Sequence, residues 1–158
     1  MNAPKCTSID LIADELIEVV EFFSARLALM EDSFVREKPS EERWAIIEVL
    51  GHLIDSAANN HQRFVRALQT DSLEFPKYDQ NFWVKSQRYD ECDWDNLIEF
   101  WKLYNLQLAH IIRRIPDEKM RVKCTIMPNE PVSLSFLVED YLVHLKHHLN
   151  KISERTGI

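Results

Sequence analysis

Residues 134–154 read LSFLVEDYLVHLKHHLNKISE, and their apolar positions recur at the spacing of one helix face. The positions expected to face inward are Leu134, Leu137, Tyr141, His144, Leu145, His148 and Ile152. Ser133 precedes this stretch and Gly157 lies just beyond its end, which is typical of helix boundaries. The stretch therefore predicts a packed helix that carries two histidines on its buried face.

Three earlier stretches have the same periodicity and predict helices over about 8–30, about 45–69, and from about Asp93 to just before Pro116. The positions expected to face inward include Leu11, Leu16 and Phe23 in the first, Ile46, Leu53 and Phe64 in the second, and Phe100, Trp101 and Leu108 in the third. The chain has only two glycines, which disfavours a turn-rich β fold. We therefore expect one all-α domain over 1–158, a four-helix bundle.

The connections between these helices are short or moderate except for 70–92, which is rich in aromatic residues. A structureless connection of this length is unusual in a compact domain unless it crosses the bundle or covers a site. One long crossover makes the second and third helices parallel and turns the fourth back against the third. The expected topology is up-down-down-up.

His144 and His148 lie one helical turn apart, close enough to share one metal ion. A third ligand is available in His52, which begins a polar stripe along the second helix. The stripe consists of His52, Ser56, Asn59 and Arg63. At 1.5 Å per residue, His52 lies ~10 Å from the start of the second helix, and His148 and His144 lie ~9 and ~15 Å from the end of the fourth. If these two helices are antiparallel, the three histidines therefore lie at a similar height in the bundle. Three histidines leave coordination positions open, and they suit Zn²⁺, Ni²⁺ or Fe²⁺.

Four stretches of the chain form a distinctive combination: Trp44 with EVLGHLIDS at 48–56, NHQRF at 60–64, PKYDQ at 76–80 with Trp83, and DYLVHLKHHL at 140–149. With these stretches the chain resembles the DinB/YfiT-like superfamily of metalloenzymes over nearly its whole length. The resemblance implies a four-helix bundle with one long crossover and the metal ligands His52, His144 and His148. It also implies a homodimer and transfer of a low-molecular-weight thiol to an electrophile. Ala45 departs from the family, which carries Ser or Thr there as a helix cap.

Other polar residues near the predicted ligands have two interpretations each. Asp55 can orient a ligand imidazole or accept a proton as a catalytic group, or it can be a solvated helix acid; the same choice holds for Asp140. Arg63 can bind a carboxylate of a substrate or cofactor, or pair with a surface acid. Tyr78 and Trp83 can cover the metal from the crossover, or plug the end of the bundle.

Three other histidines are not expected to bind the metal. His147 points about 100° away from the face of the ligand pair, and His61 and His110 have no partner at ligand spacing. The cysteines, Cys6, Cys92 and Cys124, are widely spaced and odd in number, which predicts three reduced thiols.

The net charge of −7 disfavours nucleic-acid and membrane-surface partners. No apolar run approaches the ~20 residues that span a bilayer, and residues 1–10 lack the features of a signal peptide, so we expect a cytoplasmic protein.

The sequence leaves three functions open. The first is an enzyme whose metal activates a thiol or water to attack a small-molecule substrate, as a thiol S-transferase or a hydrolase. The alternative is a non-catalytic metal-binding bundle that acts as a stress-response or binding module, which a fourth protein ligand such as His147 or Asp55 would favour. The third is a helical interaction protein without a metal.

Overall fold

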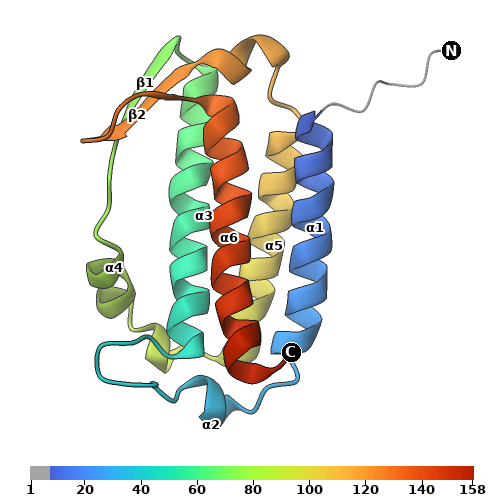
Figure 1. Ribbon diagram of the computed structural model, residues 1–158, viewed down its shortest axis with the longest axis vertical. Coiled ribbons are helices and arrows are strands. Elements are labelled where there is room, and N and C mark those ends of the chain that lie inside the picture. Colours follow the sequence, from blue (N-terminus) through green and yellow to red (C-terminus); the bar gives the residue numbers. More distant parts are fainter. Residues whose placement is uncertain (1–7) are drawn as a thin grey trace, which may run out of the picture.

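Four long helices form a bundle in the computed structural model, which describes residues 8–158, and a small sheet closes one end (Figure 1). In chain order the elements are α1 (Ser8–Leu27), α2 (Asp32–Val35), α3 (Ile46–Leu68), β1 (Ser72–Pro76), α4 (Gln80–Gln87), the 3₁₀ turn η1 (Tyr89–Glu91), α5 (Trp94–Ile112), the 3₁₀ turn η2 (Asp117–Arg121), β2 (Lys123–Met127), β3 (Val132–Ser133) and α6 (Leu134–Thr156). The expected four-helix bundle is confirmed, and the first helix ends at Leu27 rather than near Met30.

The crossover runs along the outside of the bundle from the end of α3 to the start of α5, so these two helices are parallel (Figure 1). The α6 helix runs antiparallel to both. The connection is not a structureless loop, because it holds β1, α4 and η1. Its ordered elements give the crossover fixed points of contact with α3.

Side-chain caps explain where several helices begin. Asp93 accepts a hydrogen bond from the Asn96 amide at the start of α5, and Ser133 accepts one from the Phe136 amide at the start of α6. At the start of α3, Ala45 has no side-chain oxygen that could accept such a hydrogen bond. The Glu48 carboxylate instead accepts from the Ala45 amide at 2.8 Å, which is one half of a capping box.

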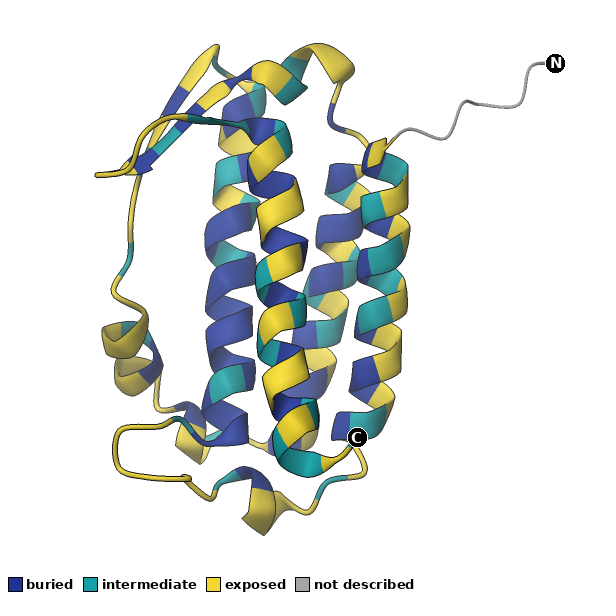
Figure 2. Ribbon diagram, viewed as in Figure 1, coloured by how far each residue is buried: buried dark blue, intermediate teal, exposed yellow. Residues whose placement is uncertain are grey.

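The core lies between the helices, and α3 is its most buried element (Figure 2). Every residue from 50 to 57 is buried, because α5, α6 and α4 pack around this helix. Two residues expected in the core are exposed instead: Leu11 at 61% and Phe100 at 53%. Leu11 lies two residues from the buried Ile9, and therefore about 200° away around the helix. Phe100 is one residue, or about 100°, from the buried Trp101.

The sequence did not predict the sheet, in which β2 pairs parallel to β1 and antiparallel to β3. Leu73 and Cys124, partners in the register, are both buried against the end of the bundle. The described helices include none long and apolar enough to cross a membrane. Cys92 and Cys124 are free thiols, and Cys6 lies outside the described residues.

Candidate metal centre

The three histidines from α3 and α6 converge at one point, as the spacing argument predicted. His52 Nε2 lies 3.3 Å from His144 Nε2, and one ring nitrogen from each of His52, His144 and His148 lies within 4.8 Å of the other two. The antiparallel course of the two helices brings the residues to the same height. His147, by contrast, is exposed and does not belong to the cluster.

Burial keeps the three imidazoles neutral. His52 is 1% exposed, and loss of hydration lowers its pKa to about 3, helped by the neighbouring histidines. Burial, and then electrostatic interactions with His144, His147 and Lys151, lower the pKa of His148 to about 4. The pKa of His144 is also lowered, mainly by burial. A neutral imidazole has a free lone pair, which is the form that binds a metal.

The geometry of the cluster fits a divalent metal. Two nitrogens held 2.0–2.1 Å from a tetrahedral zinc lie about 3.3 Å apart, which matches the separation between His52 and His144. His52 Nδ1 is buried and has no hydrogen-bond partner within residues 8–158. The group contains three potential ligands and no fourth His, Cys, Asp or Glu from the described part of the chain.

Side chains around the triad fix the rings. His144 Nδ1 lies 3.4 Å from Ser56 Oγ, which leaves Nε2 on the side of His52. The Trp44 ring packs on the His52 ring at 4.9 Å between centroids. Ser56 is in turn held by Asn60, whose Nδ2 donates to the Ser56 carbonyl at 2.9 Å. These contacts restrict the orientation of the imidazoles without using the nitrogens that face one another.

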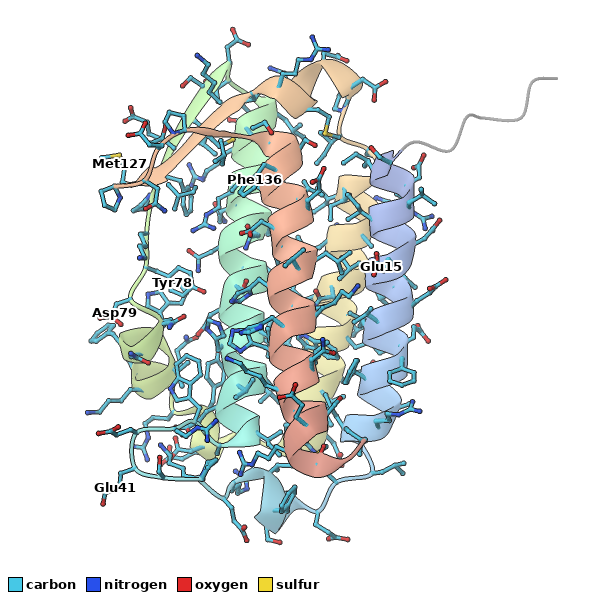
Figure 3. The ribbon with its side chains drawn as sticks, viewed as in Figure 1. Glu15, Glu41, Tyr78, Asp79, Met127 and Phe136 are labelled. Carbon is cyan, nitrogen blue, oxygen red and sulfur yellow. The ribbon has the colours of Figure 1, made fainter. Side chains whose placement is uncertain are left out.

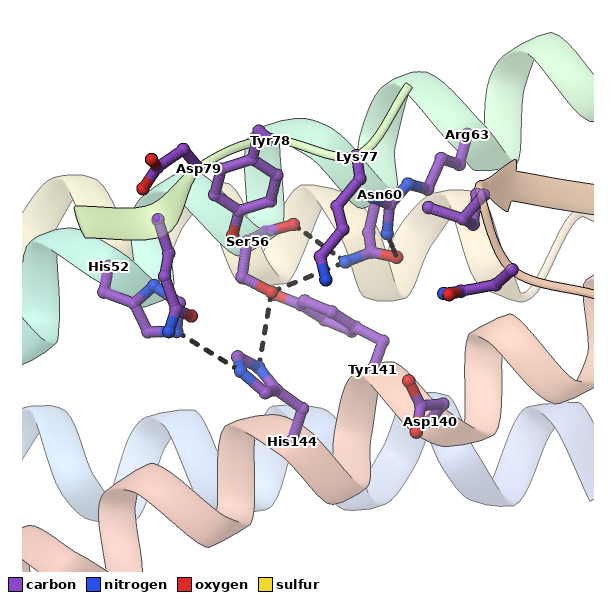
Figure 4. Close-up of a pocket in the computed structure, with 13 residues that line it drawn as sticks. His52, Ser56, Asn60, Arg63, Lys77, Tyr78, Asp79, Asp140, Tyr141 and His144 are labelled. Carbon is purple, nitrogen blue, oxygen red and sulfur yellow. Dashed lines mark hydrogen bonds between the residues drawn. The ribbon is translucent and has the colours of Figure 1, made fainter. Parts of the chain in front are cut away.

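A cavity of about 690 Å³, which we call the His52 cavity, opens beside the triad (Figure 4). Its lining includes His52, His144, Ser56, Asn60, Arg63, Lys77, Tyr78 and Asp140. The sequence predicted Asn59 on the polar stripe, but Asn60 lines the His52 cavity and Asn59 lines a different one. The reason is that a step of four residues from Ser56 stays on the face of α3 that borders the His52 cavity. The volume of the His52 cavity is within the range of small-molecule binding sites.

Tyr78 reaches the His52 cavity from the crossover (Figure 3). This position agrees with the interpretation in which Tyr78 covers the metal site, rather than with a plug at the end of the bundle. Burial and the nearby Asp55 carboxylate raise the pKa of Tyr78 to about 12, so its hydroxyl stays protonated at neutral pH. Trp83 packs on Tyr78 at 5.0 Å between centroids but lines another cavity. The crossover therefore presents one aromatic hydroxyl to the His52 cavity.

Arg63 is half-buried in the cavity wall. Burial lowers the pKa of its guanidinium, against the attraction of Tyr78 and Asp140. Its one hydrogen bond within the described residues runs from Nη1 to Asn60 Oδ1, at a long 3.5 Å, and Nε is buried without a partner. The structure gives it no ion pair in this part of the chain, so pairing with a surface acid is wrong.

Asp55 is 2% exposed, so the interpretation as a solvated helix acid is wrong. One carboxylate oxygen accepts hydrogen bonds from the Tyr89 hydroxyl and from Gln87 Nε2, both at 2.7 Å. Burial raises its pKa, and these two hydrogen bonds oppose the rise. Asp55 faces the crossover rather than the His52 cavity. No sequence pattern indicated these two partners, because both are distant from Asp55 along the chain.

Other candidates lie at the edge of the site or away from it. Asp140 is exposed on the wall of the His52 cavity. His148 does not line the His52 cavity but a separate cavity of about 680 Å³, together with Trp44. His61 lies 3.1 Å from the Tyr104 hydroxyl and His110 contacts Arg114, which agrees with structural roles for both.

Comparisons with known proteins agree with this architecture. The model of the DinB superfamily matches residues 15–152. A protein of Oceanobacillus iheyensis named "Putative metal-dependent hydrolase" is 25% identical over 156 residues, which cover 96% of this chain and 89% of the relative. YfiT of Bacillus subtilis, which carries the same description, is 23% identical over 147 residues, covering 89% of this chain and 82% of its own. A solved structure of YfiT, described as having "an unusual four-helix bundle topology", aligns with a TM-score of 0.78 at 21% identity, covering 99% of this chain and 94% of that one.

Proposed function

Because the chain belongs to the DinB superfamily, we propose that it is a metal-dependent enzyme in which His52, His144 and His148 bind one divalent ion. The observation that carries the proposal is the convergence of three neutral imidazoles, two of which, those of His52 and His144, line a cavity of small-molecule size. The names of the curated relatives support metal dependence.

An open coordination position favours catalysis over a structural staple. A structural zinc site is closed by four protein ligands, whereas a catalytic one keeps a position for water or substrate. His147 and Asp55, the two candidates for a fourth ligand, both lie outside the cluster. Bound there, the metal would lower the pKa of a coordinated water or thiol enough to make a nucleophile near neutral pH.

The protein side chains have separate tasks in this proposal. Ser56 orients His144 through Nδ1, so that Nε2 faces the metal. Tyr78, which stays protonated, donates a hydrogen bond to the substrate or its leaving group. Asp55 acts as a positioning residue, because it binds the crossover that carries Tyr78.

The nucleophile we favour is water, since both curated relatives are named as hydrolases. A low-molecular-weight thiol is the second candidate, because a soft thiolate is a good ligand for the same ions. Zn²⁺ and Ni²⁺ both suit three imidazoles, and Fe²⁺ can also occupy such a site.

Metal content is the first test. Protein purified without a histidine tag is dialysed against Zn²⁺ or Ni²⁺ and measured by elemental analysis. We expect about one metal per chain in the wild type and in His147→Ala, an exposed control next to the cluster, and loss of the metal in His144→Ala. Absence of metal from the wild type would overturn the proposal.

Turnover is the second test. The loaded protein is assayed on a panel of esters, amides and electrophiles, with and without small thiols. Product formation that needs the metal but no thiol supports a hydrolase, and formation that needs the thiol supports a transferase. We expect His148→Ala to lose turnover and His147→Ala to keep it. Full turnover in His148→Ala would refute a catalytic role for the triad.

A further inference from the structure

The end of the His52 cavity away from the triad has features of an anion site. Arg63 lies there beside Asn60, and Lys77, which also lines the cavity, enters it from the crossover side (Figure 4). Neither cation forms an ion pair within residues 8–158. Arg63 is half-buried, whereas Lys77 is exposed. A half-buried charge without a counterion is unfavourable, and a ligand that supplies the missing charge removes that cost for Arg63.

Comparison with other half-buried arginines shows what is unusual about Arg63. Arg36 forms a bidentate ion pair with Asp32, and Arg155 donates to the Glu37 carbonyl at 2.6 Å. Arg63 has only one long hydrogen bond, to Asn60, and a cation–π contact with the Phe75 ring 5.4 Å from its centroid, neither of which supplies a counterion. Asp140 attracts it through space but does not reach ion-pair distance, and is itself exposed to solvent. The guanidinium is therefore held in the wall with most of its donors unused.

Asn60 holds the guanidinium in place by its carbonyl oxygen while its own amide group is anchored to Ser56. His52, Ser56, Asn60 and Arg63 thus form a continuous line along one face of α3, from the triad to the arginine (Figure 4). Eleven residues separate the two ends of that line, or ~16 Å along the helix axis. A ligand that touches both ends is elongated.

We propose that the substrate of this enzyme carries a carboxylate that binds Arg63, with Lys77 at its side, while its reactive bond lies at the triad. The inference rests on the proposed function, since it assumes that the reaction takes place at a metal bound by the three histidines. A carboxylate matches the fork of a guanidinium and neutralises one positive charge. A phosphate dianion is less suitable, because Asp79 and Asp140 also line the cavity and repel two negative charges more strongly than the single charge of a carboxylate.

The test uses straight-chain hydroxamic acids of increasing length, each made with a terminal carboxylate or a terminal primary amide. The hydroxamate binds the zinc, and the other end probes Arg63. Affinity is measured by titration calorimetry on the zinc-loaded protein. At the optimal length we expect the carboxylate form to bind about tenfold more tightly than the amide form, as for a hydrogen bond to a charged group.

Three variants locate the effect. Arg63→Gln is expected to remove the carboxylate advantage and Arg63→Lys to retain part of it. Arg66→Gln is the matched control, because Arg66 lies on the same helix, is exposed and points away from the cavity. It is expected to retain the full advantage.

The possible failures can be told apart. Equal binding of the carboxylate and amide forms at every length, with the hydroxamate still bound, would overturn the carboxylate site and leave the metal site intact. An advantage that persists in Arg63→Gln would also overturn it. Failure of the protein to take up zinc or bind either form would refute the proposed function, and this inference with it.

Discussion

For the substitution Gly51→Ala on α3, helix propensity and the structure predict changes of opposite sign in the free energy of unfolding. Alanine in place of glycine inside a helix stabilises it by about 1 kcal/mol. In this structure, however, a Cβ at position 51 would lie 2.2, 2.3 and 2.6 Å from three atoms of the Tyr89 ring. Carbon atoms pack at about 3.5 Å or more, so the ring would have to move by about 1 Å or more.

The movement would have a second cost. Tyr89 is 6% exposed and donates its hydroxyl proton to the buried Asp55 carboxylate at 2.7 Å. Overpacking costs about 1–3 kcal/mol, and weakening a hydrogen bond to a charged group about 1.5–3 kcal/mol. After the gain in helix propensity is subtracted, we expect Gly51→Ala to lower the free energy of unfolding by roughly 1.5–5 kcal/mol.

Urea unfolding of the metal-free protein, followed by circular dichroism, measures this effect. For a chain of this size the urea midpoint should fall by about 1 M or more. The same substitution in a Tyr89→Ala background tests the cause, because without the ring the extra methyl group has space and should stabilise the helix by up to about 1 kcal/mol. A midpoint that is unchanged or higher in the Gly51→Ala protein would refute the packing argument.

Three further predictions concern stability. The lowered pKa of His52 means that the unfolded chain binds more protons than the native state between pH about 3 and 6.5, so stability falls as the pH falls through this window. From pH 7 to about 5 the metal-free protein should lose roughly 2 kcal/mol from His52 alone, and a urea midpoint that does not fall would contradict this. Ala45→Ser completes the capping box begun by Glu48 and should raise the free energy of unfolding by ~1 kcal/mol, whereas a lower melting temperature would count against it. Tyr141→Phe leaves the fully buried Asn105 without its hydroxyl donor and should cost about 1–3 kcal/mol in the same urea assay; no loss would show that this bond is not needed.

Apolar periodicity predicted the four long helices because their burial follows the helical period over many turns. The buried positions Leu16, Val20, Phe23 and Leu27 of α1, for example, are three or four residues apart. The small sheet gave no comparable signal, since its strands have two to five residues and β1 pairs with β2 across a long separation in sequence. Exposed apolar residues such as Leu11 also resemble core residues when the sequence alone is read.

The convergence of the three histidines was predictable because each residue of a helix adds a fixed rise along the axis. In two antiparallel helices, the number of residues from each end therefore gives the height of a side chain in the bundle. The partners of Asp55 were not predictable, because hydrogen bonds to Gln87 and Tyr89 depend on how the crossover lies against α3. Arg63 illustrates the same limit: its position on the polar stripe is visible in the sequence, but its lack of a counterion is a tertiary property.

The polar face of α3 is costly for a helix whose only role is structural. Residues 50–57 are buried without interruption, yet this stretch includes His52, Asp55 and Ser56. His52 Nδ1 and Asp55 Oδ2 have no hydrogen-bond partner among the described residues, and each such buried group costs about 1–3 kcal/mol. Apolar side chains in these positions would give a more stable bundle. Groups that break the local rules of packing in this way are expected at functional sites, where a ligand or metal supplies the missing interaction. The most buried helix of the molecule is therefore the one whose sequence is least explained by stability.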